Sequence, residues 1–309
     1  MYQFKKILVS MDLTEMDQQL IKFTSYLAQA VEIEEIHFVK VAKNLDLPDN
    51  IKKEFPGIVE NALLDRKQKL DKQVSEYWDL NLDIKYTTNV IQGDSPSKTL
   101  VDLVEKHNID LVVAGWKSPE KGSGIIPQRL ARRAPTSLFI VPENMEPKVK
   151  RIMVPIDFSD DAESAVEEAI TIARGSKEEI EIICQNVYTV PQGYHYSGKT
   201  KEEFAELMKK NAAKDYKAFI RKIDTKGVNI RPVYSEDIND DKVTDIRDLA
   251  DDVKPDLMIL GAKCRSRTTA LFIGNIAEKV IQDMGKDYPM LIVRPKNEKA
   301  GIIDFIREF

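Results

Sequence analysis

The sequence repeats itself once, and this repeat constrains the fold more than any other feature. Residues 6–14 (KILVSMDLT) match residues 151–159 (RIMVPIDFS) at an offset of 145 (6 to 151), and residues 110–115 (DLVVAG) match residues 256–261 (DLMILG) at an offset of 146 (110 to 256). Residues 140–141 match residues 292–293 at an offset of 152 (140 to 292), so the second copy carries about six further residues before its last apolar run. Self-similarity at a fixed spacing predicts two copies of one domain.

The repeat also sets the expected domain boundaries, because a chain of 309 residues suits two domains of ordinary size. We expect a first domain over residues 1–145 and a second over residues 148–298, joined by the short polar segment 143–148. Residues 299–309 form an apolar C-terminal tail. Two readings of this tail are open: it packs on the domains, or it docks onto a partner protein.

Apolar runs of strand length alternate with amphipathic segments in each copy. In the second copy we expect strands at 152–156, 180–187, 228–233, 257–260 and 290–293, and helices at 160–174, 201–226, 243–253 and 276–284. Continuous apolar runs are typical of strands buried on both faces of a parallel sheet. Strands that alternate with helices imply right-handed crossovers, so the predicted class is α/β, with two tandem Rossmann-like, doubly wound domains.

Composition and charge exclude several functions. The net charge of −5 arises from 46 basic and 51 acidic residues mixed along the chain, which gives no footprint for nucleic acid. No apolar run approaches membrane-spanning length and the first residues lack a signal-peptide core, so we expect a cytoplasmic protein without membrane insertion. Two cysteines give no disulfide framework, and the three histidines lie far apart without metal-ligand spacing, so no metal site is assigned.

The chemistry is expected at the carboxyl ends of the strands, where ligands bind in open parallel sheets. In the second copy these ends are Asp157, Val187 and the loop from Gly261 to Asn275. That loop has Gly261, Cys264, nine residues, and then Gly274-Asn275 before a helix. It resembles the motif of ATP-binding universal stress proteins, which carry Gly-x-x-Gly, nine residues, and Gly-Ser or Gly-Thr.

This resemblance covers both copies and implies a sheet of five parallel strands in each, with the two domains paired about a pseudo-two-fold axis. It implies a site for ATP or a related adenine nucleotide, with or without Mg, mainly in the second copy. There Asp157 and Val187 would border the adenosine, and Gly261, Cys264, Gly274, Asn275 and Ile276 would line the phosphates. The matching places in the first copy are Asp12, Val41 and Gly115.

Both copies depart from the family motif. Cys264 puts a side chain where a glycine would let the backbone approach a phosphate, so it is expected to crowd the ligand. In the first copy Ser118 replaces the second glycine and the spacer shrinks to the five residues 119–123. The first copy is therefore expected to be structural or to bind something smaller, although Gly122-Ser123-Gly124 retains the composition of an anion-binding turn.

Structural roles for the same residues stay open beside the ligand roles. Asp157 suits a helix cap together with Ser159 as well as it suits ligand contact. Val187 suits the core, Gly261 a turn after its strand, and Gly274 close packing of the loop on the helix. Cys184 is interpreted as a buried small hydrophobe, and Cys264, in a basic loop, as a residue with a minor redox alternative.

Three classes of function are compared. The resemblance favours a nucleotide-responsive regulatory protein of the stress response, with an unidentified protein partner and the option of a homodimer. The alternative is a tandem scaffold that binds no nucleotide and acts through protein contacts. An enzyme of the wider superfamily, such as an adenylating ligase, would carry His-Ile-Gly-His or Ser-Gly-Gly-x-Asp-Ser, and neither occurs. Catalysis is therefore expected to reach at most slow ATP hydrolysis or autophosphorylation.

Overall fold

The computed structural model describes residues 4–44, 47–117, 124–262 and 274–294. Contacts within the chain divide it into two compact units, Gln3–Pro147 and Lys148–Phe309, the second also holding residues 1–2. We call these units the first half and the second half and describe each by itself.

The first half is a parallel sheet with strand order β3-β2-β1-β4-β5. Its strands are β1 (Lys6–Met11), β2 (Glu35–Ala42), β3 (Lys85–Gln92), β4 (Leu111–Trp116) and β5 (Ser137–Pro142). Its helices are α1 (Met16–Ala30), α2 (Asp49–Glu54), α3 (Ile58–Tyr77), α4 (Pro96–His107) and α5 (Ile125–Arg133).

The second half repeats this topology, with strand order β8-β7-β6-β9-β10 and parallel pairing throughout. Its strands are β6 (Arg151–Pro155), β7 (Glu181–Thr189), β8 (Asn229–Asp237), β9 (Leu257–Gly261) and β10 (Met290–Val293). Its helices are α6 (Asp160–Gly175), the 3₁₀ helix η1 (Gln192–Ser197), α7 (Lys201–Ile220), α8 (Lys242–Val253) and α9 (Asn275–Met284).

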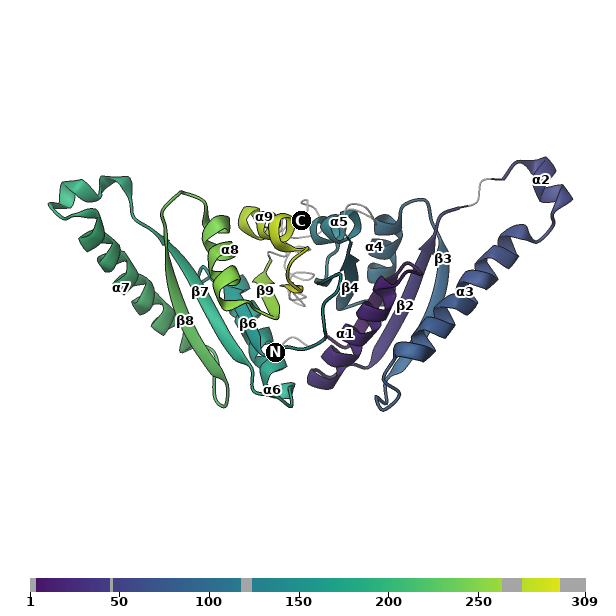
Figure 1. The fold of residues 1–309 in the computed structure, drawn as a ribbon, viewed down its shortest axis with the longest axis horizontal. Helices are drawn as coiled ribbons and strands as arrows, with labels where there is room; N and C mark the ends of the chain where they lie inside the picture. The colour runs from purple at the N-terminus through teal and green to yellow at the C-terminus, as the bar shows by residue number, and fades with distance from the viewer. Residues whose placement is uncertain (1–3, 45–46, 118–123, 263–273, 295–309) are drawn as a thin grey trace, which may run out of the picture. The chain divides into compact units, whose positions relative to one another are not determined.

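Helices cover both faces of each sheet, which confirms the predicted doubly wound α/β architecture with five parallel strands in each half. In the first half α1 packs on α3, while α4 packs on α5 (Figure 1). In the second half α8 packs on α9, and α6 and α7 lie against β6 and β7 respectively. Each strand order reverses direction beside its first strand, between β1 and β4 or between β6 and β9, and this is where such folds place ligands.

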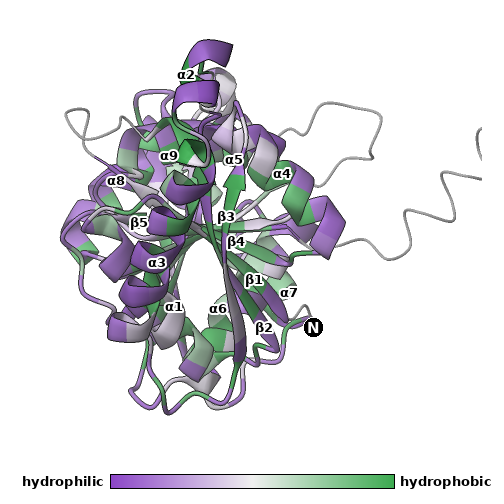
Figure 2. Cartoon of the chain, turned by 90° about the vertical axis from the view of Figure 1, so that its right-hand side faces the viewer, coloured by the Kyte–Doolittle hydropathy of each residue, from purple (hydrophilic) through white to green (hydrophobic). Residues whose placement is uncertain are grey.

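The cores are the sheet strands and the helix faces that cover them. All six residues of β5 are buried, as are all four of β10. Strand β4 has hydrophobic colour in Figure 2, whereas α2 is largely hydrophilic. Within the described parts of the chain, no helix combines the length and the apolar content that a membrane crossing requires.

The structure differs from the sequence prediction at the end of α7, which stops at Ile220 instead of near residue 226. The amides of Lys222 and Ile223 bond to the carbonyls of Phe219 and Ile220, three residues back, so the last turn tightens and leaves the α-helical path. Ile223 is thereby buried. The 3₁₀ helix η1 lies between β7 and α7, where no helix was predicted.

Candidate functional site

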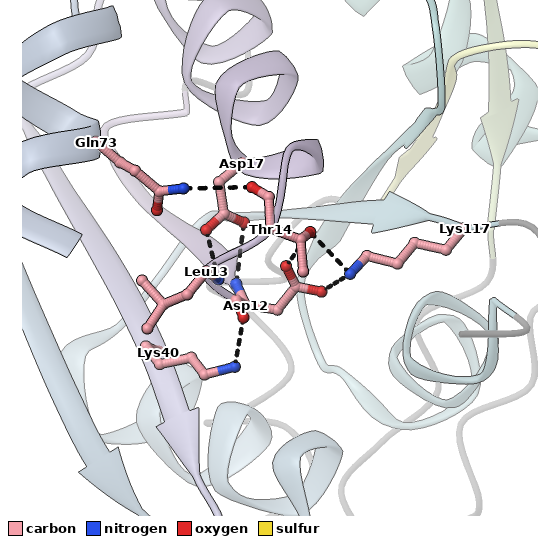
Figure 3. A network of polar contacts seen from close by, with 7 residues as sticks. All are labelled: Asp12, Leu13, Thr14, Asp17, Lys40, Gln73 and Lys117. Carbon is pink, nitrogen blue, oxygen red and sulfur yellow. Dashed lines mark hydrogen bonds and ion pairs between the residues drawn. The ribbon is translucent and has the colours of Figure 1, made fainter. Parts of the chain in front are cut away.

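The carboxylate of Asp12, at the end of β1, is engaged by the protein itself in the first half. Lys117, the residue after β4, donates from Nζ to Asp12 Oδ2 and to Thr14 Oγ1 at 3.0 Å. Thr14 Oγ1 in turn donates to Asp12 Oδ1 at 2.6 Å (Figure 3). Both oxygens of the predicted ligand-binding carboxylate therefore have internal donors.

The turn after β1 is held by a second, fully buried carboxylate. Asp17 Oδ1 accepts from the amide of Asp12 (2.9 Å) and Oδ2 from the amide of Leu13 (2.7 Å), as Figure 3 shows. These bonds fix Leu13 in the left-handed region, with φ of 65°. Burial raises the pKa of Asp17 to about 7, although hydrogen bonds from the backbone and the charge of Lys40 oppose this rise.

Lys40 brings a second ammonium group to the same strand end. Its Nζ donates to the carbonyl oxygen of Asp12 at 2.8 Å. The next residue, Val41, is buried with 8% of its surface exposed. Asp12, directly after β1, and Val41, in β2, therefore lie at the ends of adjacent strands. Lys40 and Lys117 both donate hydrogen bonds to Asp12.

The start of α5 is closed by an aromatic ring. Gly124 is the N-cap of α5, with φ of 58°, and a Cβ added there would lie 2.5 Å from Cε2 of Trp116. Gly115 is equally crowded, because a Cβ there would lie 2.7 Å from Cγ of Met16. Trp116 therefore fills the place beside the helix N-terminus where the family resemblance puts phosphates.

In the second half the matching strand end carries Asp157, which has no lysine partner among the described residues. Asp157 is exposed, and its Oδ1 accepts from the amide (3.1 Å) and the hydroxyl (2.5 Å) of Ser159. Ser159 Oγ then accepts from the amide of Ala162 at 3.3 Å and caps α6. Asp157 thus supports the helix cap, which was the structural alternative, and no described residue donates to its Oδ2.

The glycines of the second half have two different environments. A Cβ at Gly261 would overlap the carbonyl oxygen of Asp161 in the first turn of α6, so the close approach of β9 to that helix requires glycine. Gly274 caps α9 with φ of 93°, and nothing described lies within 4 Å of a Cβ there. Asn275 and Ile276 begin α9, and the Ile276 side chain is 44% exposed.

Val187 lies near the end of β7 and is half-buried. This degree of burial is compatible with packing in the core and with contact to a ligand. The neighbouring Asn186 donates from Nδ2 to the carbonyl oxygen of Ile156 at 3.0 Å, and so ties the ends of β7 and β6 together. Cys264, the rest of segment 263–273, Gly122-Ser123 and the tail 299–309 lie outside the described residues.

Four residues that shape the first-half site were not singled out from the sequence: Asp17, Lys40, Trp116 and Lys117. The repeat contained a signal for three of them. In the alignment of the two copies, the second copy has Ala162, Asn186 and Ala262 at the positions of Asp17, Lys40 and Trp116. At each of these positions the first copy therefore has a charged or bulky residue and the second copy a smaller or uncharged one. Differences between the copies at strand ends therefore mark where the two sites diverge.

The first half also holds a cleft of about 780 Å³ beside Thr14 and Lys117. It is bounded by the first turn of α1, by Lys69–Tyr77 of α3, and by Glu143 and Asn144 after β5. Such a volume lies within the range of small-molecule sites. Over the described parts of both halves, no three His, Cys, Asp or Glu side chains gather as a metal-ligand group.

Comparison with known proteins identifies relatives of both halves. The sequence pattern described as "Universal stress protein family" matches residues 3–142 and again residues 148–294. Two universal stress proteins of Methanocaldococcus jannaschii are 24% and 28% identical, over 48% and 50% of this chain and 96% and 88% of their own lengths. The crystal structure of a universal stress protein from Archaeoglobus fulgidus superposes with a TM-score of 0.62 at 17% identity, covering 96% of this chain and 98% of the other.

Proposed function

The chain belongs to the universal stress protein family, and from this premise we propose that its second half binds ATP or a related adenine nucleotide, whereas its first half has lost that site. The protein would then act as a regulatory module in the stress response, with nucleotide occupancy altering its contacts with a partner protein. No residue is given a catalytic role in this proposal.

The contrast between matched positions in the two halves carries the proposal. Gly124 lies against the indole of Trp116, whereas Gly274, its counterpart at the start of α9, has no described atom within 4 Å of a Cβ. The residue that matches Trp116 in the second half is Ala262, which lacks the bulk to cover the helix start. The described part of the second half therefore leaves room where the first half is filled.

The aspartates that follow the first strand of each half also differ, because only Asp12 has a lysine partner among the described residues. Asp12 is paired with Lys117 and bonded to Thr14. Asp157 is exposed and bonded only to Ser159 among the described residues, so Oδ2 can accept a ribose hydroxyl.

The described residues of the second half fit a nucleotide in chemical type. Asp157 and the backbone near Val187 would hold the adenosine, and the amides at Gly274, Asn275 and Ile276 would meet the phosphates at the positive end of α9. Mg²⁺ would enter with the triphosphate, because this ion commonly keeps phosphate and water ligands.

A matched pair of variants tests the proposal in the full chain. Asp157→Asn should weaken equilibrium binding of fluorescent ATP about tenfold, as expected when a charged hydrogen-bond acceptor is lost. Asp12→Asn should leave that affinity unchanged. Equal losses in the two variants would contradict the assignment to the second half.

The tandem scaffold is the second candidate, and the closed first half favours it. A copy whose strand end is occupied by Lys117 and whose helix start is covered by Trp116 retains the fold without the ligand space. If the full chain shows no saturable ATP binding, with or without Mg²⁺, the scaffold function replaces the nucleotide function.

A further inference from the structure

The first half has a sheet edge along β3 that pairs with no described strand. β3 pairs with β2 on one side, and none of its eight residues is buried. The amide of Gly93, directly after β3, donates to the carbonyl oxygen of Ala42 in β2 at 3.0 Å. Successive residues of a strand direct their N–H and C=O groups to opposite edges. Counted back from Gly93, the residues that direct these groups away from β2 are Tyr86, Thr88, Val90 and Gln92.

The matching edge strand of the second half is protected against further pairing, whereas β3 is not. β8 contains Pro232, which has no amide hydrogen, and three charged residues, Arg231, Glu236 and Asp237. β3 has no proline, and its one charged residue is Lys85 at its first position. Natural sheets use proline and charged side chains to prevent edge strands from pairing with other chains. The absence of these devices from most of β3 indicates a surface that can accept another strand.

Helix α3 extends this surface with an exposed apolar side chain. Lys67 Nζ donates to Thr88 Oγ1 at 2.7 Å, and Asp71 Oδ1 accepts from the same hydroxyl, so this side of α3 lies against β3. Leu64 precedes Lys67 by one turn on the same side of the helix and is 56% exposed. Tyr86, in β3 itself, is 37% exposed. A strand added along β3, together with its own covering helix, would remove apolar surface of this kind from water.

The two ends of β3 carry opposite charges, which selects one orientation for a second copy of the same strand. Lys85 begins β3, and its side chain is 76% exposed. Asp94 follows two residues after the strand, and among the described residues only Asn44 donates to its carboxylate, to Oδ1 at 2.6 Å. In an antiparallel pair the start of each strand lies beside the end of the other, so Lys85 of each copy approaches Asp94 of the other. A parallel pair would instead place like charges together.

We propose that two copies of the chain associate through antiparallel pairing of their β3 edges, so that one sheet continues from the first half of one copy into the first half of the other. The proposal assigns a surface to the homodimer that the sequence leaves as an option. It does not depend on nucleotide binding in the second half.

Sedimentation equilibrium of the full chain at several concentrations tests the proposal and should give a mass that rises from one chain to two. Val90→Pro removes an outward amide hydrogen and should weaken dimerisation at least about tenfold, as expected when hydrogen bonds are lost and the added ring obstructs the pairing. Val90→Thr keeps the amide and a side chain of similar shape, so it is the matched control and should dimerise like the wild type. Tryptophan fluorescence establishes that the variants are folded, because Trp78 and Trp116 both lie in the first half.

A charge exchange provides a second test that leaves the backbone of β3 unchanged. Lys85→Glu should weaken dimerisation about tenfold, because a like charge then lies beside Asp94 at both symmetric ends of the pair. Lys85→Glu combined with Asp94→Lys restores opposite charges and should recover the dimer. Three results would overturn the proposal: the full chain stays monomeric at every concentration, a folded Val90→Pro dimerises as well as Val90→Thr, or the combined charge exchange fails to recover what Lys85→Glu loses. If Val90→Pro does not fold, the charge exchange alone decides.

Discussion

Lys117 and Asp12 form an ion pair across the ends of β4 and β1, although 105 positions separate them in the sequence. The Lys117 side chain is 14% exposed and that of Asp12 is 34% exposed, so solvent screens the pair only in part. Asp12 thereby has a cation of the same chain where the family resemblance expects a ligand.

The strength of this pair can be measured with a double-mutant cycle of Lys117→Met and Asp12→Asn. We expect a coupling free energy of about 1 kcal/mol, near the upper end of the values for exposed pairs. Urea unfolding followed by tryptophan fluorescence is specific for the first half, because both tryptophans of the chain lie there. Asp157→Asn serves as the control and should not move this transition. Strictly additive effects of the two substitutions would show that the pair contributes nothing.

Asp17 should make the stability of the first half depend on pH. Its folded-state pKa is raised to about 7 by burial, from an ordinary value near 3.8, so between these values the folded chain holds a proton that the unfolded chain releases. The stabilisation from this proton is complete below pH 3.8 and is lost as the pH rises through about 7. Asp17→Asn removes this titration and also one acceptor oxygen for the turn amides.

The destabilisation caused by Asp17→Asn should therefore grow as the pH falls from 8 to 5, starting from about 1–3 kcal/mol for the lost hydrogen bond. Urea titrations of both proteins at several pH values, read by tryptophan fluorescence, give this difference directly. A difference that is constant across the range would mean that Asp17 stays ionised throughout.

Much of the fold could be predicted, because the repeat indicates two similar domains and the apolar runs indicate their buried strands. Strands that are buried on both faces are continuously apolar, so the sequence predicts them. The start of the helix after β6 could be predicted because Ser159 is a residue type that caps helices. The sequence alignment matches Gly115 with Gly261, and the structure shows one reason for glycine at both positions. Each lies where a strand end meets the first turn of a helix.

The occupation of the first-half site could not be predicted in the same way. The segment Gly115-Trp116-Lys117 differs from Gly261-Ala262-Lys263 by one residue, and nothing local shows that the indole covers Gly124. That contact depends on how α5 is placed, which is a property of the tertiary structure. The pairing of Lys117 with Asp12 likewise depends on the adjacency of β1 and β4.

Cys184 should be inert in the native protein. Its side chain is fully buried in β7, and burial raises the pKa of the thiol to about 12, although a hydrogen bond with Tyr216 opposes the shift. At pH 8 almost no thiolate is present, and thiolate is the reactive form. In a Cys264→Ser variant, a disulfide reagent such as Ellman's should therefore detect no fast thiol until denaturant is added. Rapid labelling of that variant under native conditions would contradict the burial of Cys184.

The two matching glycines should differ sharply in their tolerance of alanine. In Gly261→Ala the new Cβ overlaps the carbonyl oxygen of Asp161, which belongs to the backbone of α6 and cannot rotate away. The helix must shift, at a cost of about 1–3 kcal/mol. In Gly115→Ala the new Cβ meets the side chain of Met16, a flexible thioether that can change rotamer, so the cost should stay below about 1 kcal/mol.

Hydrogen exchange measured by mass spectrometry compares these two variants in the full chain, and it reads the second half, which contains no tryptophan. Gly261→Ala should accelerate exchange in the first turns of α6, because the displaced helix start loses the cap that Ser159 provides. Gly115→Ala should leave α1 close to the wild-type rate and thus serves as the matched control. If both variants accelerate exchange equally, backbone contact is not the reason for glycine at position 261, and the requirement would lie instead in the loop that follows β9.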